Sequence, residues 1–214
     1  MKVALFLEEE RATFMPWRKK WENRFSHAHN SDFSRRKHEQ GETSMISEPK
    51  LSDRPEQHYV AIRTQVTLQA LGSGVIPRLQ REVRTWLEKQ GIAPAGAPFI
   101  RYLVIDMMVK LDIEVGWPVA HALSGNDRIS AGVLPAGRYA SLIYIGPYEG
   151  DGLIKANAVL LDWGAQHGIV WDSWQTEHGN AFGARLESYL KGPENEPDPA
   201  KWETEVAIRV KDQS

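Results

Sequence analysis

The sequence predicts an α+β domain in which a strand–helix–strand–strand unit occurs twice, forming an antiparallel sheet with two helices on one side. Three observations support this. Each half has a β-branched segment followed by apolar residues at helical spacing. Two further strand candidates follow each helix. The helix ends also match, because residues 86–92 (WLEKQGI) are paralleled by residues 163–169 (WGAQHGI). We therefore expect a pseudo-twofold duplication with a central ligand groove at the junction of the halves.

The composition is that of a globular protein without an obvious charged partner. The 214 residues carry a formal net charge of −2, which gives no reason to expect nucleic acid or a membrane as a partner. The chain has no cysteine, which excludes a disulfide framework, a thiol nucleophile and a Cys-ligated zinc. No apolar run approaches the roughly 20 residues that span a bilayer. We expect a cytoplasmic protein without a cofactor or metal.

Residues 1–44 differ in composition from the rest. The stretch 26–44 has one aromatic residue and no aliphatic residue beyond Ala28, so it buries too little surface to offset its ordering entropy. We interpret 1–44 as a disordered or mis-assigned extension, with translation starting at Met45, and 45–214 as the domain. The alternative is a basic DNA-binding arm, but acidic residues dilute its two clusters, at 18–20 and 35–37.

The elements of the first unit follow in order. Residues 59–66 (YVAIRTQV) favour a strand, and residues 72–74 (GSG) interrupt the chain. Residues 75–90 carry apolar side chains at helical spacing, and Gly91 stands where a C-terminal cap is expected. Residues 99–105 and 109–119 are the next two strand candidates.

The second unit gives the same order. Its predicted strand covers 138–145, its helix covers 153–167 with Gly168 as the stop, and its last two strands cover 182–190 and 202–210. Residues 120–137 are expected to hold the crossover and the start of the next strand.

Several short sequence motifs, which occur along the chain in this order of elements, resemble those of the GyrI-like domain family. This family is found in gyrase-inhibitor-like proteins and in effector-binding domains of AraC-type and MerR-type regulators. The motifs are YVAIR (59–63), DIEVG (112–116), LPAGRY (134–139), GPY (146–148) and LESY (186–189), followed by WETE (202–205). The resemblance covers roughly residues 47–210. It implies a pseudo-twofold domain with an aromatic groove around a carboxylate, which in regulators binds lipophilic, often cationic molecules. The family's Glu-x-Tyr word matches Glu187 and Tyr189.

Strand alternation indicates how these residues would form a site. In residues 184–190, one face carries Arg185, Glu187 and Tyr189, and the other face, with Leu186, Ser188 and Leu190, is expected to pack against the helices. A carboxylate beside a phenol ring suits a flat or cationic guest. The competing interpretation is a solvated strand face with an Arg–Glu pair.

Further candidates complete the predicted site. Pseudosymmetry places Tyr102 opposite Glu187. Tyr148 either closes one end of the groove or packs its turn. Trp171 and Trp174 are expected in a loop, Trp171 capping the core and Trp174 acting as a lid over ligand.

Three functions follow, in order of preference. The first is a stand-alone binder of a lipophilic, cationic or planar aromatic small molecule. The second is a hydrolase of strained, cyclopropane-type electrophiles with Glu187 as the catalytic residue, which the resemblance to stand-alone family members suggests. The third is an effector domain of a regulator or a gyrase-inhibitor-like interaction protein. No DNA-binding pattern is recognisable beside the domain, and no Gly-x-Ser-x-Gly word supports a serine esterase.

Overall fold

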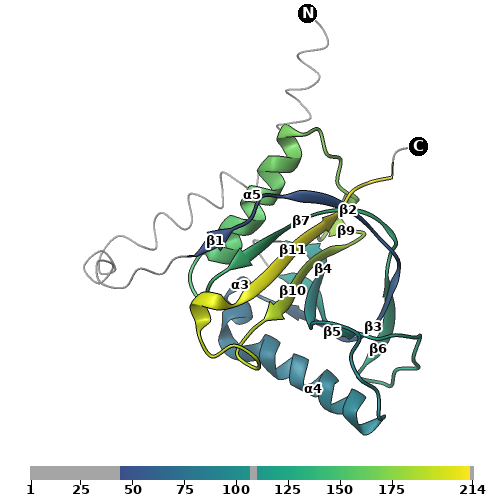
Figure 1. The fold of residues 1–214 in the computed structure, drawn as a ribbon. Coiled ribbons are helices and arrows are strands. Elements are labelled where there is room, and N and C mark those ends of the chain that lie inside the picture. The colour runs from purple at the N-terminus through teal and green to yellow at the C-terminus, as the bar shows by residue number, and fades with distance from the viewer. Residues whose placement is uncertain (1–43, 107–109, 213–214) are drawn as a thin grey trace, which may run out of the picture. The chain divides into compact units, whose positions relative to one another are not determined.

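The computed structural model describes residues 44–106 and 110–212. The predictions for residues 1–44 therefore lie outside the described residues, apart from Ser44. The domain contains an antiparallel sheet with the strand order β1-β7-β11-β10-β4-β5-β3-β6, from which β2 and the β8–β9 hairpin branch (Figure 1). The strands are β1 (Met45–Ile46), β2 (Lys50–Arg54), β3 (Gln57–Val66), β4 (Phe99–Ile105), β5 (Leu111–Pro118), β6 (Ser130–Leu134), β7 (Gly137–Ile145), β8 (Ser173–Thr176), β9 (Gly179–Phe182), β10 (Arg185–Lys191) and β11 (Glu203–Arg209).

One long helix follows the first strand of each unit. α4 spans Ile76–Lys89 and α5 spans Gly152–Gln166. Before α4, the chain passes through α3 (Leu68–Ala70) and an irregular π turn (Leu71–Val75) in which Gly74 has a φ of 82°. A short 3-10 turn, η2 (Pro199–Lys201), precedes β11. The order β3-α4-β4-β5 thus recurs as β7-α5-β10-β11, with the β8–β9 hairpin inserted before β10. The sequence duplication itself stays a prediction.

The two units exchange their leading strands. β2 precedes β3 along the chain but pairs with β7, and β6 precedes β7 but pairs with β3. Each unit is therefore extended by a strand that leads into the other unit. This exchange holds the two units together in addition to the central β10–β4 pairing.

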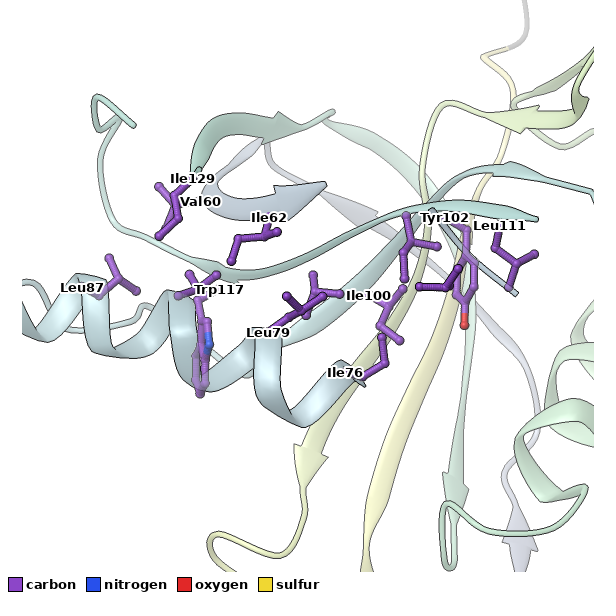
Figure 2. Packing of buried hydrophobic residues seen from close by; sticks show 14 of the residues in the cluster. Val60, Ile62, Ile76, Leu79, Leu87, Ile100, Tyr102, Leu111, Trp117 and Ile129 are labelled. Carbon is purple, nitrogen blue, oxygen red and sulfur yellow. The ribbon is translucent and has the colours of Figure 1, made fainter. Parts of the chain in front are cut away.

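α4 is amphipathic, and its apolar side faces the sheet. Its buried residues are Ile76, Leu79, Val83 and Leu87, which follow the spacing of one helix face. They pack with residues of β3 and β5, including Val60 and Trp117 (Figure 2). α5 covers β7 and β11 in the same way through Ala156, Leu160 and Gly164. The predicted α+β class, with both helices on one side of the sheet, is confirmed.

The other face of the sheet has a separate apolar cluster, which no helix supplies. It consists of Tyr59, Ala61, Phe99, Tyr139, Ala184, Leu186 and Ala207. The prediction that the Leu186 face of β10 packs against the helices is therefore wrong. Glu187 is the register partner of Ile100 and Val206, which both belong to the helix-side clusters. The side chain of Glu187 thus lies on the face that the helices cover.

No helix in the described part of the chain is long and apolar enough to cross a membrane.

Candidate functional site

The candidate site lies on the central strand pair, β10 and β4. α4 packs on β5 and β3, whereas α5 packs on β11 and β7, so the β10–β4 seam runs between the two helices. On the helix side, this seam presents Arg185, Glu187 and Tyr189 from β10 and Tyr102 from β4. The topology therefore brings together one acid, one base and two phenols at the junction of the two units.

Glu187 is buried and accepts hydrogen bonds at both carboxylate oxygens. Only 7% of it is exposed. The Tyr102 hydroxyl donates to Oε2 over 3.0 Å, and Asn157 Nδ2 donates to Oε1 over 2.9 Å. Pseudosymmetry predicted that Tyr102 lies directly opposite Glu187. The structure instead places Ile100 at that register position. The longer side chain of Tyr102 reaches Glu187 from two residues further along β4, as a diagonal neighbour.

Asn157 of α5 joins Glu187 to Arg185. Its Oδ1 accepts a hydrogen bond from Arg185 Nη2 over 2.9 Å, while its Nδ2 also donates to Leu153 O over 3.0 Å. The Arg185 guanidinium lies 5.0 Å from the centre of the Phe182 ring, within the range of a cation–π contact. A buried acid and a half-buried base are thus linked through one neutral amide.

Burial displaces the pKa values of the groups in this chain. Desolvation raises the pKa of Glu187, and the hydrogen bonds from Asn157 and Tyr102 and the charge of Arg185 oppose that rise. Desolvation lowers the pKa of Arg185. Desolvation, together with the nearby Glu187 carboxylate, raises the pKa of Tyr102 and of Tyr189 well above the ordinary value. Both phenols therefore remain protonated near neutral pH and can donate hydrogen bonds.

An aromatic group continues from the acid toward the end of β10. The ring centres of Tyr148 and Tyr189 lie 5.2 Å apart in an edge-to-face arrangement, and those of Tyr148 and Trp202 lie 4.4 Å apart. The Tyr148 hydroxyl donates to Lys191 O over 3.2 Å, and burial raises the pKa of Tyr148 to about 12. Tyr148 thus packs its turn and at the same time touches the Glu187 strand through Tyr189.

Two buried polar atoms on this face have no hydrogen-bond partner among the described residues. They are Arg185 Nε and Thr204 Oγ1. Thr204 is fully buried and is the register partner of Tyr189 on β11. Buried polar groups are almost always paired, so unpaired ones at one place call for a partner that the chain does not supply, such as water or a bound molecule.

Trp174 lies apart from the cluster. It is on strand β8 rather than in a loop, pairs with Ala181 of β9, and is 54% exposed. Its role as a lid stays a prediction. Trp171 is buried among the residues that pack under α5, as expected for a residue that caps the core.

Glu114 and Glu205, which are equivalent residues of the last strand of each unit, lie on the other face of the sheet in structural pairs. Glu205 forms two hydrogen bonds with Arg54, the shorter over 2.7 Å. Glu114 accepts from the Tyr59 hydroxyl over 2.6 Å.

Sequence reasoning missed Asn157 and Trp202 as members of the site. Asn157 is a half-buried polar residue in the second turn of α5, and its sequence neighbours Ala156 and Ala158 give no indication of a charged partner. A poor helix former inside an apolar helix was the available signal. Among residues 44–106 and 110–212, no three His, Asp or Glu side chains are placed to hold a metal ion.

The fold and the site define a class: an α+β domain with a buried acid and several phenols at the seam of two units. The family model described as "GyrI-like small molecule binding domain" matches residues 47–211, and the chain belongs to this family.

Solved structures share the fold. The C-terminal domain of EcmrR is 22% identical, with a TM-score of 0.59, over 78% of this chain and 98% of that one. EcmrR in its complex with DNA is 21% identical, with a TM-score of 0.60, over 98% of this chain and 70% of that one. An uncharacterised conserved protein from Listeria innocua is 12% identical, with a TM-score of 0.53, over 76% and 92%. No curated protein sequence matches the chain.

Proposed function

We propose that this domain binds a lipophilic, planar aromatic small molecule, neutral or singly cationic, at the β10–β4 seam around Glu187. Tyr102, Tyr189 and Tyr148 would supply ring contacts, and Trp174 would close over the ligand. The observation that carries the proposal is the burial of the Glu187 carboxylate in a hydrogen-bonded chain beside aromatic rings.

The cost of that burial supports a functional role. Removing a carboxylate or a guanidinium from water costs several kcal/mol, and a stable interior seldom needs such a pair. Here both ions lie on the helix face, where an apolar pair would pack equally well. The unpaired Arg185 Nε and Thr204 Oγ1 supply a donor and a hydroxyl beside the rings. A flat molecule with one polar edge would satisfy these atoms while its rings stack on the phenols.

The charge of Arg185 bears on the class of ligand. A lone buried carboxylate would favour cations strongly, but the Arg185–Asn157–Glu187 chain places a compensating positive charge beside it. We infer that ring shape and hydrogen bonding dominate recognition, and that a cation gains only part of the attraction that an uncompensated acid would give.

A matched pair of ligands tests this proposal. Proflavine is a planar cation and acridone is a neutral molecule with a similar three-ring frame, and both can be titrated against tryptophan fluorescence. We expect saturable quenching by both. In Glu187→Gln the affinity for proflavine should fall roughly 10-fold, as expected for loss of a hydrogen bond to a charged group, while acridone changes little.

Glu114→Gln is the control, because it removes a half-buried carboxylate from the opposite face of the same sheet. It should leave both titrations unchanged. Equal losses in E187Q and E114Q would show a general effect on the sheet, and an absence of saturable binding by any planar aromatic in the wild type would refute the proposal.

The hydrolase alternative uses the same residues. The raised pKa of Glu187 suits a general base, and the Tyr102 hydroxyl at 3.0 Å could donate a proton to a leaving oxygen or carbon. Product analysis with a cyclopropane-containing alkylator separates the two functions. Turnover above the rate in buffer that disappears in E187Q supports hydrolysis, whereas binding without turnover leaves the domain a binder.

A further inference from the structure

An open pocket lies against α4, apart from the cluster that Glu187 forms with Arg185, Asn157 and the tyrosines. Its volume is about 460 Å³, and it is formed by one side of α4 and the segment of residues 126–129 that precedes β6. Cavities of roughly 300–1,000 Å³ are the size range of small-molecule sites. None of its lining residues belongs to the Glu187 cluster.

The rim of this cavity is strongly basic. Arg78, Arg81, Lys89 and Arg128 line it, against the single carboxylate of Glu82. Arg128 Nε lies 2.9 Å from Glu82 Oε1, and this contact lowers the pKa of Glu82, so the pair is charged and compensated. Arg81 and Lys89 form no ion pair with a carboxylate among the residues that the structure describes, whereas the charge of Arg78 also acts on Glu82 and helps to lower its pKa.

Arg84, on the same helix, shows that this is not the ordinary pattern of α4. It forms ion pairs with Glu88, one turn further on, and with Glu194. A helix surface adapted only for solubility tends to alternate charges in this way. Arg78, Arg81 and Lys89 instead follow one side of the helix at spacings of three and eight residues, so their charges add along the cavity.

The cavity also has an apolar and fixed lining. Trp86 is half-buried and Ile129 is 2% exposed, and both line it. Figure 2 shows Ile129 beside Val60 above the Leu87 end of the helix. Asn126 Oδ1 accepts hydrogen bonds from the backbone N–H groups of Arg128 and Ile129, both over 2.8 Å. The wall opposite α4 is therefore held in place before any ligand arrives.

We propose that this cavity is a second binding site, for an organic anion with an apolar body, such as an aromatic carboxylate or an aryl phosphate. The half-buried Trp86 ring, backed by the buried Ile129, would take the apolar body, and the unpaired cations would take the anionic group. Arginine and lysine both bind carboxylates and phosphates, and arginine can do so with two parallel hydrogen bonds. Whereas Arg185 compensates the charge of Glu187 at the seam, the residues that line this site carry a net positive charge.

The test is an amide NMR titration of the whole chain with three probes on one ring system: 2-naphthoate, 2-naphthyl phosphate and neutral 2-naphthol. We expect saturable shifts for both anions at Arg81, Thr85, Lys89 and Asn126, and no saturation with naphthol. Inorganic phosphate should bind more weakly than the naphthyl anions, because it has no apolar body.

Two variants on the same helix sharpen the result. Arg81→Gln removes an unpaired cation of the cavity and should weaken anion binding about 5-fold near physiological salt. Arg84→Gln removes the same charge one turn away, outside the cavity, and should leave binding within about 2-fold. Both side chains are exposed, so both variants should fold.

Four results would overturn the proposal. They are no saturable shift at α4, equal shifts with naphthol, equal losses in R81Q and R84Q, or anion-induced shifts that fall on β4 and β10 instead. The last result would assign the anion to the seam. Because the anion probes and the planar cations report on different residues, failure here leaves the Glu187 proposal standing, and the reverse also holds.

Discussion

Replacing Asn157 by alanine should destabilise the domain far more than an exposed change on the same helix. Asn157 makes three hydrogen bonds, to Glu187, Arg185 and Leu153 O. The variant leaves a buried carboxylate oxygen and a partly buried guanidinium N–H without this partner. Each buried group left unsatisfied costs about 1–3 kcal/mol, and more if charged. Alanine returns roughly 0.5 kcal/mol through its helix propensity.

The net loss should be about 2–4 kcal/mol in the free energy of unfolding. For a domain of this size that corresponds to a fall in Tm of roughly 5–15 °C. Urea unfolding followed by circular dichroism measures the difference, provided that the m-value is unchanged. Lys155→Ala is the matched control, because it removes an exposed ion pair with Asp151 from the same helix and should cost less than about 1 kcal/mol.

The refuting result is an N157A variant as stable as K155A. It would mean that water reaches Glu187 and Arg185 and replaces the amide, so that the two ions do not form a buried chain. The proposal for the seam would then lose the physical cost on which it rests.

Three further predictions concern charge and packing. Because burial raises the pKa of Glu187, this group stabilises the fold below its ordinary pKa and loses that contribution as the pH rises above it, so the stability of Glu187→Gln relative to the wild type should increase from acidic toward neutral pH; parallel urea-unfolding profiles would contradict this. Arg185→Gln should tighten proflavine binding roughly 5-fold by removing the compensating charge, and leave acridone unchanged in the same fluorescence titration. Gly164→Ala should lower stability by about 1–3 kcal/mol in thermal unfolding, since its methyl group would overlap the Trp171 ring, whereas Gly72→Ala, with open space around it, should not.

The regular elements could be predicted because local sequence dictates them. The strand expected at 99–105 is β4 to the residue, and the helices expected at 75–90 and 153–167 differ from α4 and α5 by one residue at each end. Gly91 and Gly168 both have a φ of 67°, the left-handed conformation that ends a helix and that glycine adopts without strain. β2 was missed because KLSDR shows neither alternation nor β-branched residues.

The face of β10 could not be assigned from its sequence. Alternation separates Glu187 from Leu186 but does not say which of the two faces a helix covers. The more apolar set was assigned to the helices, which assumes a solvated second face. Here the second face is buried as well, around Tyr59, Phe99 and Tyr139, so an apolar set was needed on both sides. Local sequence could not identify Asn157 for a similar reason, because its role depends on a contact with a strand 30 residues away.

The hydrogen bonding of the ion network at the seam can be checked atom by atom. Networks that serve only the fold gain from closing every hydrogen bond, because each open one costs free energy in a dry interior. At the seam, both oxygens of Glu187 accept hydrogen bonds. Arg185 Nε and Thr204 Oγ1, on the same face and beside the same tyrosines, have no hydrogen-bond partner among the described residues. The opposite face also holds two such atoms, Arg101 Nε and Ser141 Oγ, so it is the position of the seam atoms that favours a ligand. Their place at the junction of two units, between two helices, is where a guest with a polar edge would complete the network.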